Sequence, residues 1–195
     1  MTTVFVTVGT TSFNELVEAA SSKSFRGLLY AKGYRKLILQ IGRGELTPQE
    51  DASSGEVALS YYRYKDTLAD DIRQADLVIS HAGAGCILET LDAEKPLVVV
   101  VNETLMGNHQ LELARQLHRD GHIQYCVPRD LSAVVDALDP ASLRLLPHGQ
   151  PRLFGEWLTK TANEPSDYQS GVVKVRRVLF AVIVAIVALL LYAFR

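Results

Sequence analysis

The chain has 195 residues, of which 48% are hydrophobic, and a formal net charge of −2 at pH 7. This length suits one globular domain with a full core, and the nearly balanced charge gives no sign of a nucleic-acid-binding face, so no nucleic-acid partner is expected. The two cysteines, Cys86 and Cys126, have neither metal-ligand spacing nor a pairing pattern, which suits a reducing compartment.

The first half of the chain alternates short apolar runs with helix-like segments. Residues 3–9 form a β-branched run that ends in glycine, which predicts a buried strand followed by a turn. Ser12 and Glu15 have the spacing of a capping box, so a helix is expected over 12–22. The elements expected next are strands at 36–44 and 57–64, a short helix at 66–75 and a strand at 76–80.

The second half continues the same alternation. Gly121 follows a helical pattern as a C′ glycine, and Asp130 stands where a helix cap is expected. Five or six apolar strands alternating with helices predict an α/β fold, a Rossmann-like parallel sheet with helices on both faces, over residues 1–162. The expected elements of this half are helices at 86–94, 108–121 and 130–140 and strands at 96–102 and 123–127.

A helix is expected at 150–162, where the domain ends. Its apolar stripe packs either on the domain's own core or on a partner, and it is formed by Leu153, Phe154, Trp157 and Leu158. Residues 163–173 are polar and rich in turn-forming residues, so they are expected to be a linker.

Seventeen uncharged residues, 178–194, come directly before Arg195, the last residue of the sequence. As a helix this stretch reaches ~26 Å, near the lower limit for a bilayer, and the endoplasmic reticulum membrane, at about 27 Å, suits it best. The basic residues gather before it at 174–177, so the positive-inside rule keeps the preceding domain in the cytosol. Residues 174–195 are therefore expected to form a C-terminal membrane anchor, with a buried core helix as the alternative. Residues 1–13 lack the features of a signal peptide.

Three loops follow strands whose carboxyl ends should share one edge of the sheet, where ligands of such folds lie. The loop 9–12 and the loop 81–85 are built from small residues and each opens a helix, whose N-terminus attracts anions. We expect a phosphate or diphosphate there; a tight turn without a ligand is the alternative. The expected contacts are Gly9, Thr10, Thr11, Ser12, His81, Ala82, Gly83, Ala84 and Gly85.

Polar residues near these loops suit a nucleotide sugar. Glu89 can accept two hydrogen bonds from a ribose diol, or else it complements the helix dipole. Asn108, His109 and Gln110 offer the donors and acceptors that sugar hydroxyls need, with a helix cap and solvated neighbours as the alternative. No lysine follows the glycines as in a Walker motif, and the first turn lacks the dinucleotide fingerprint, so an NAD-dependent enzyme is disfavoured.

Four segments resemble a known family: VFVTVGTTSFNELV, ADLVISHAGAGCILETL, KPLVVVVN and NHQLELA. Over about residues 1–160 the chain resembles the donor-binding catalytic subunit of the heteromeric eukaryotic UDP-N-acetylglucosamine transferase of dolichol-linked N-glycan assembly. This subunit is of the type of the glycosyltransferase family 28 C-terminal domain. More distantly, the chain is similar to the C-terminal half of the bacterial lipid-linked GlcNAc transferase.

The resemblance implies one half of an inverting GT-B glycosyltransferase with UDP-GlcNAc as its donor and neither metal nor cofactor. The two loops would then line the diphosphate, Glu89 would hold the ribose, and Asn108, His109 and Gln110 would reach the GlcNAc hydroxyls. A membrane-anchored partner would hold the acceptor, GlcNAc-diphosphate-dolichol, at the cytosolic face of the endoplasmic reticulum. The general base is not evident, so the partner is expected to provide or complete it.

One departure from the family concerns the tail, since the usual subunit has no membrane span. Residues 163–195 therefore imply either a self-anchoring form or a variant with altered activity. The alternative function is a tail-anchored, non-catalytic nucleotide-sugar-binding scaffold or regulator.

Overall fold

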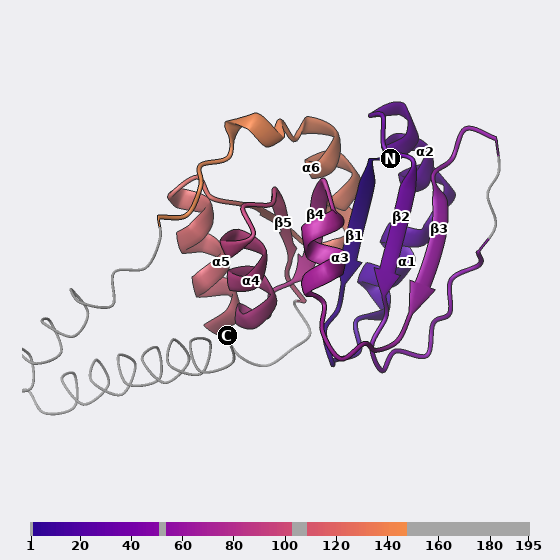
Figure 1. Cartoon of the computed structure of the whole chain (residues 1–195), viewed down its shortest axis with the longest axis horizontal. Helices are drawn as coiled ribbons and strands as arrows, with labels where there is room; N and C mark the ends of the chain where they lie inside the picture. The colour runs from indigo at the N-terminus through magenta and orange to yellow at the C-terminus, as the bar shows by residue number, and fades with distance from the viewer. Residues whose placement is uncertain (1, 51–53, 103–108, 148–195) are drawn as a thin grey trace, which may run out of the picture. The chain divides into compact units, whose positions relative to one another are not determined.

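The computed structural model describes residues 2–50, 54–102 and 109–147. They belong to one compact unit, Met1–His148, whose centre is a six-stranded sheet in the order β3-β2-β1-β4-β5-β6 (Figure 1). All neighbouring strands pair in parallel, which confirms the predicted sheet. The strands are β1 (Thr3–Thr7), β2 (Lys36–Gln40), β3 (Ala58–Tyr62), β4 (Leu77–His81), β5 (Leu97–Val100) and β6 (Gln124–Cys126).

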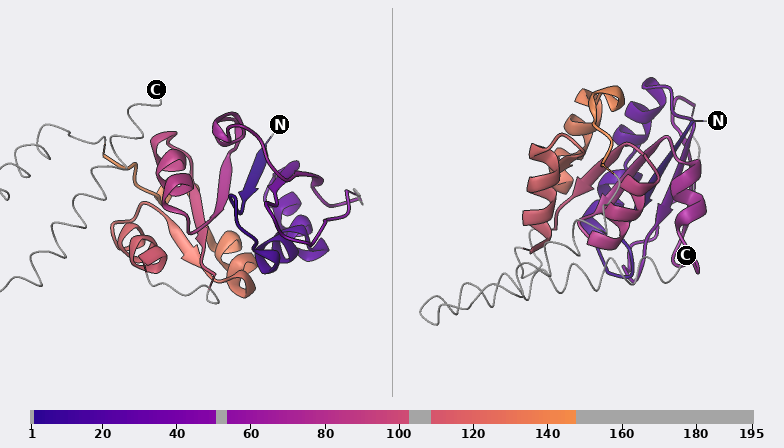
Figure 2. Two further views of the ribbon diagram at one scale, coloured as in Figure 1. Left: turned by 90° about the horizontal axis from the view of Figure 1, so that it is seen from below. Right: turned by 60° about the vertical axis from the view of Figure 1, so that its left-hand side comes forward.

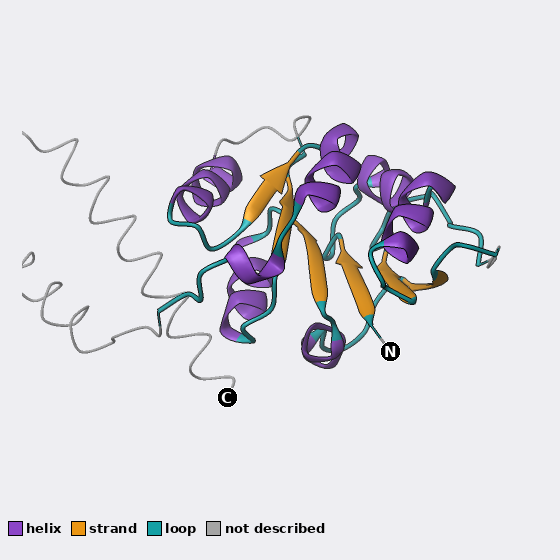
Figure 3. Cartoon of the chain, turned by 90° about the horizontal axis from the view of Figure 1, so that it is seen from above, coloured by secondary structure: helices purple, strands orange, loops and turns teal. Residues whose placement is uncertain are grey.

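Helices cover both faces of the sheet, as predicted (Figures 2 and 3). One apolar cluster joins alternate strand residues such as Val4 and Val6 to α1 (Asn14–Ser21), α2 (Lys23–Ala31) and α6 (Leu131–Ala137). The other joins residues such as Phe5 to α3 (Ala69–Gln74), α4 (Ala84–Asp92) and α5 (His109–Arg119). Every residue of β1 and β5 is buried, because helices cover both faces of these central strands, and the interior of each strand is accordingly apolar.

The expected helix at 12–22 differs from the structure. The capping box at Ser12 is wrong: α1 begins at Asn14, and the N-cap residue, Phe13, makes no side-chain cap bond. Phe13 is 3% exposed, so burial of an aromatic ring rather than a hydroxyl cap fixes the start of this helix. The chain then bends at Ser22, whose hydroxyl accepts a bond from the Phe25 N–H and caps α2.

Sequence reasoning missed α2 because a charged residue interrupts its apolar face. Phe25, Arg26 and Leu29 are all buried, and Arg26 Nη2 lies 2.7 Å from Glu56 Oε2. This ion pair allows a guanidinium to occupy a core position.

Two predictions about later helix boundaries have different outcomes: the C′ glycine at Gly121 is confirmed, and the helix cap at Asp130 is wrong. Gly121 has φ +81° and follows α5, and the His122 N–H bonds to the Leu117 carbonyl at 2.9 Å, as expected after a C′ glycine. Asp130 makes no side-chain cap bond, because a 3₁₀ turn, η1 (Pro128–Asp130), leads directly into α6. A second 3₁₀ turn, η2 (Pro140–Ser142), follows α6.

Within the described ranges, no helix combines the length and the apolar character needed to cross a bilayer. The expected helix at 150–162, the linker at 163–173 and the anchor at 174–195 lie outside these ranges.

Candidate nucleotide-sugar site

The strand order reverses between β1 and β4, and the two small-residue loops follow these two strands. Thr7, the last residue of β1, pairs in register with Ser80 of β4. In doubly wound sheets such a switch point is where ligands bind, beyond the carboxyl ends of the strands. The structure therefore brings the loop 9–12 and the loop 81–85 together, as predicted.

The side chain of Gln40, the last residue of β2, holds the turn after β1 through hydrogen bonds on its buried side. Gly9 has φ +65°, and its N–H donates to Gln40 Oε1 at 2.9 Å and to Thr7 Oγ1 at 3.1 Å. The Gly9 carbonyl accepts from Gln40 Nε2 at 2.7 Å. The Gly9 N–H is therefore engaged within the protein, and any ligand contact of this turn falls to the residues that follow it.

The residues that follow Gly9 form an exposed part of the loop. Thr10, Thr11 and Ser12 are exposed, and the Thr11 hydroxyl donates to the Val8 carbonyl at 2.8 Å. The loop rests on Gly42, where a Cβ would lie 2.3 Å from the Thr11 carbonyl oxygen. This arrangement leaves the hydroxyls of Thr10 and Ser12 at the surface.

His81, the last residue of β4, packs against both glycine turns. A Cβ added at Gly9 would lie 2.5 Å from His81 Cε1, and one added at Gly83 would lie 2.3 Å from His81 Nε2. The Nδ1 atom is buried and has no hydrogen-bond partner in the described ranges. Burial lowers the pKa of His81, and a hydrogen bond to the Thr7 backbone raises it by a smaller amount. The imidazole is therefore neutral at neutral pH.

The second loop leads into α4. The N–H of Gly83, its N-cap, donates to the His81 carbonyl at 2.8 Å. The first-turn N–H groups of Ala84, Gly85 and Cys86 have no intrahelical acceptor and point out of the helix end. Ala84 and Gly85 are exposed, and a Cβ at Gly85 would meet no atom within 4 Å. This end of α4 can therefore accept an anion at close range.

A buried polar row lies beneath the two loops. Thr7, Gln40 and Ser80 stand in register on β1, β2 and β4, and each is at most 2% exposed. Burial and the Glu89 carboxylate raise the pKa of Cys86, while hydrogen bonds to Ser80 and Thr7 lower it by a smaller amount.

Sequence reasoning missed Gln40. The one available signal was a polar residue at the end of the apolar run KLILQ.

Glu89 lies in the second turn of α4, one turn beyond the open helix start. Four residues after Gly85, it faces the same side of the helix as that exposed glycine, and it is half-buried. Its position is consistent with a ligand lying across the helix start, and its role in ribose binding stays a prediction. Asn108 lies outside the described residues; His109 and Gln110 are the first residues of α5.

Farther along the same edge, a hydrogen-bonded cluster joins β3 to α3. Tyr62 Oη donates to Asp71 Oδ2 at 2.5 Å, and Lys65 Nζ lies 2.7 Å from the same oxygen. Burial, with the bond to Asp71, raises the pKa of Tyr62. Within the described ranges, no cluster of His, Cys, Asp and Glu side chains is placed to hold a metal ion.

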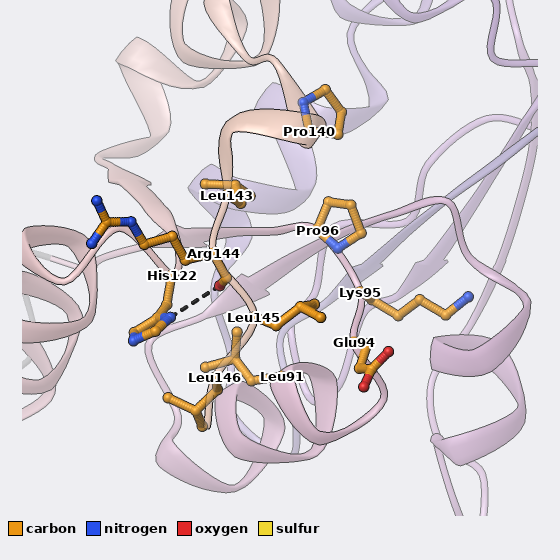
Figure 4. A pocket seen from close by; sticks show the side chains of 10 residues that line it. All are labelled: Leu91, Glu94, Lys95, Pro96, His122, Pro140, Leu143, Arg144, Leu145 and Leu146. Carbon is orange, nitrogen blue, oxygen red and sulfur yellow. Dashed lines mark hydrogen bonds between the residues drawn. The ribbon is translucent and has the colours of Figure 1, made fainter. Parts of the chain in front are cut away.

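A cavity of about 50 Å³ lies at the opposite edge of the domain, near the amino end of β5 (Figure 4). Leu91 and Glu94 from the end of α4 line it, together with Pro96 and the segment 143–146. His122 Nδ1 lies 3.0 Å from the Arg144 carbonyl, which fastens this segment to the end of α5. The cavity therefore lies away from the two loops at the switch point.

A parallel sheet in this order, with helices on both faces and two glycine-bearing loops at its switch point, is a Rossmann-like fold of the kind that forms one half of a GT-B glycosyltransferase. The chain belongs to glycosyltransferase family 28: the model of the family's C-terminal domain matches residues 3–152.

Individual proteins agree with this assignment. The chain is 56% identical over 142 residues to the human UDP-N-acetylglucosamine transferase subunit ALG13, covering 73% of this chain but 12% of that protein. An NMR solution structure of ALG13 matches 80% of this chain and 94% of its own length, with 26% identity and a TM-score of 0.60. The MurG structure from Acinetobacter baumannii matches 72% of this chain and 42% of its own, with 19% identity and a TM-score of 0.53. This chain thus spans 12% of the human relative, nearly all of the ALG13 chain in the NMR structure and less than half of the MurG chain.

Proposed function

We propose that this chain is the donor-binding subunit of an inverting glycosyltransferase that moves GlcNAc from UDP-GlcNAc to GlcNAc-diphosphate-dolichol. The observation that carries the proposal is the pairing of the exposed loop after β1 with the open N-terminus of α4 at the switch point of the sheet. The similarity to a human protein named as a UDP-N-acetylglucosamine transferase subunit supports the choice of donor.

In this proposal the diphosphate of the donor lies against the N–H groups at 84–86 and the hydroxyls of Thr10 and Ser12. Both sets of groups are exposed or face outward. They would stabilise the charge that develops on the departing UDP, because fixed dipoles aimed at such charge favour the transition state. Glu89 would accept bonds from the ribose, and Asn108, His109 and Gln110 would contact the sugar.

The proposal places the acceptor and the general base on a membrane-anchored partner subunit. The neutral imidazole of His81 packs beneath the glycine turns, so it supports the loops rather than serving as a base for the acceptor hydroxyl. Lipid-linked acceptor and cytosolic nucleotide sugar would meet at the cytosolic face of the endoplasmic reticulum. There the uncharged residues 178–194 would anchor the chain as a C-terminal tail.

Transfer of labelled GlcNAc from UDP-GlcNAc to GlcNAc-diphosphate-dolichol tests the proposal, with the full chain alone and with the candidate partner subunit added. We expect transfer only in the mixture. Transfer by the chain alone would contradict the placement of the base on a partner. Binding of UDP-GlcNAc without transfer in either sample would favour a nucleotide-sugar-binding scaffold.

A further inference from the structure

We infer that Gln40 is a positioning residue for the nucleotide-sugar site, because its amide fixes the turn after β1 before any ligand arrives. This inference rests on the proposed function and deepens it, since it concerns the same site. Gln40 is 2% exposed and lies beneath the turn, so it would act on the diphosphate only through the residues that it holds.

The side-chain amide of Gln40 uses its whole hydrogen-bonding capacity. Its Oε1 accepts from Thr7 Oγ1 at 2.5 Å and from the Gly9 N–H at 2.9 Å. Its Nε2 donates to the Gly9 carbonyl and to the Arg63 carbonyl, each at 2.7 Å. A primary amide offers two lone pairs on oxygen and two N–H groups, and all four are occupied here.

This pattern demands an amide. Gly9 presents both a donor and an acceptor to the same side chain, so its partner must accept at one atom and donate at the other. An ionised glutamate only accepts, and its second oxygen would face the carbonyls of Gly9 and Arg63; a methionine of similar length cannot donate and accepts only weakly. The bond to Arg63 also ties the turn after β1 to the segment that follows β3.

The two hydrogen bonds between the Gln40 amide and Gly9, called the clamp below, have a consequence for the ligand. Gly9 adopts φ +65°, which is only one of the conformations that a glycine reaches readily, so other contacts must select it. With both of its polar groups bound to Gln40, the turn presents residues 10–12 in one arrangement, next to the start of α4. Preorganised contacts bind a ligand more tightly because less ordering is needed on binding. Loss of the clamp should therefore weaken contacts to the diphosphate and spare those to the nucleoside.

The test compares UDP with uridine as probes on the full chain, with dissociation constants measured by NMR titration. For Gln40→Glu and Gln40→Met we expect UDP binding roughly tenfold weaker, the size of one lost hydrogen bond to a charged group, with uridine binding unchanged. Gln40→Asn shortens the stem by one methylene, so its amide should no longer reach both polar groups of Gly9; it replaces either variant that fails to fold, with the same selective loss of UDP binding expected. Arg26→Met is the matched control, because it removes a buried polar side chain from α2 and should leave the ratio of the two constants unchanged.

Hydrogen exchange at the Gly9 amide examines the clamp without any ligand. Slow exchange in the wild type and fast exchange in Gln40→Met are expected. Equal exchange in the two proteins, equal UDP affinity, or a parallel loss for UDP and uridine would overturn the inference. A wild-type chain that binds no UDP, with the Gly9 amide still protected, would instead remove the proposed function and with it the role assigned to Gln40.

Discussion

Gly9 and Gly83, from loops 74 positions apart in the sequence, both pack against the imidazole of His81. A Cβ at either glycine would enter that ring, at 2.5 Å from Cε1 for Gly9 and 2.3 Å from Nε2 for Gly83. The N–H groups of both glycines bond within the protein. These glycines therefore bring two loops together around one histidine, a role distinct from direct contact with phosphate.

Substitution of Gly9 by alanine should destabilise the fold by about 2–4 kcal/mol, because it adds a steric clash to the strain of a positive φ. Chemical denaturation measures the loss. Gly33→Ala is the matched control: Gly33 has φ +93° but a Cβ there meets nothing within 4 Å, so its cost should be only about 1 kcal/mol. In a His81→Ala background Gly9→Ala should cost less than it does in the wild type. Equal costs for the two glycines would contradict the packing described above.

Acidification should weaken the fold through His81. Burial holds its pKa below the usual 6.5 in the folded state, so as the pH falls below about 6.5 the unfolded chain takes up a proton first. The free energy of unfolding should therefore decrease from pH 6.5 down to the lowered folded pKa. Urea titrations at pH 7.5, 6.5 and 5.5 measure the slope, which should be shallower in His81→Asn.

Gly33→Ala separates titration from general destabilisation in that experiment. It changes no titratable group and keeps His81, and a Cβ there meets nothing within 4 Å, so it should be less stable at every pH with the wild-type slope. A His81→Asn protein that retains the full slope would show that other groups cause it.

Much of the fold follows from the sequence because its signals are local. The runs TVFVT and LVVV consist mostly of β-branched residues and are buried along their whole length, as strands covered on both faces are. Once these strands are parallel, the loops at residues 9 and 81 must reach the same edge of the sheet, so the place of the candidate site was also predictable.

The local details depended on distant partners. Gln40 and Gly9 are 31 positions apart, and nothing in KLILQ shows that the glutamine holds another loop. The capping box at Ser12 has the right spacing, but burial of Phe13 decides where α1 begins. Arg26 interrupts the apolar face of α2, and only its pairing with Glu56 shows why the helix still packs there.

Glu89 supplies a test of the ribose contact. Glu89→Gln should weaken UDP-GlcNAc binding by about 1–3 kcal/mol, the value of a partly buried hydrogen bond to a carboxylate. Calorimetry with UDP and with 2′-deoxy-UDP makes the test specific, because the variant should lose much of the wild-type preference for the ribonucleotide. Asp92→Asn, an exposed residue at the end of the same helix, should keep that preference. An unchanged preference in Glu89→Gln would remove this carboxylate from the site.

The uncharged residues 178–194 should hold the chain to membranes. Deletion of 172–195 should release it into the soluble fraction, and Ile186→Asp should release much of it, because a charge at the centre of a spanning helix costs about 2.5–3.5 kcal/mol. Ile186→Val, which keeps the stretch apolar, should stay with the membrane. Flotation of the chain in the absence of the partner subunit measures this, and membrane association of the deleted form would show a second anchor.

Glu94 ends α4 in a conformation that favours glycine. It is a non-glycine residue with φ 56°, and its N–H and that of Lys95 close the helix on the carbonyls of Leu91 and Thr90 at 3.0 and 3.2 Å. Glu94→Gly should relieve this backbone strain and raise the free energy of unfolding by about 0.5–1 kcal/mol, after the greater freedom of glycine in the unfolded chain is counted.

Glu94→Ala separates the backbone effect from the side chain. It removes the carboxylate that lines the cavity beside Pro96 (Figure 4) but keeps a Cβ at the same positive φ. Its stability should therefore stay close to that of the wild type while Glu94→Gly rises above both. Because this helix end lies at the opposite edge of the domain from the switch point, the gain should leave UDP affinity unchanged. Equal stabilisation by glycine and alanine would show that the carboxylate, rather than the backbone, carries the cost.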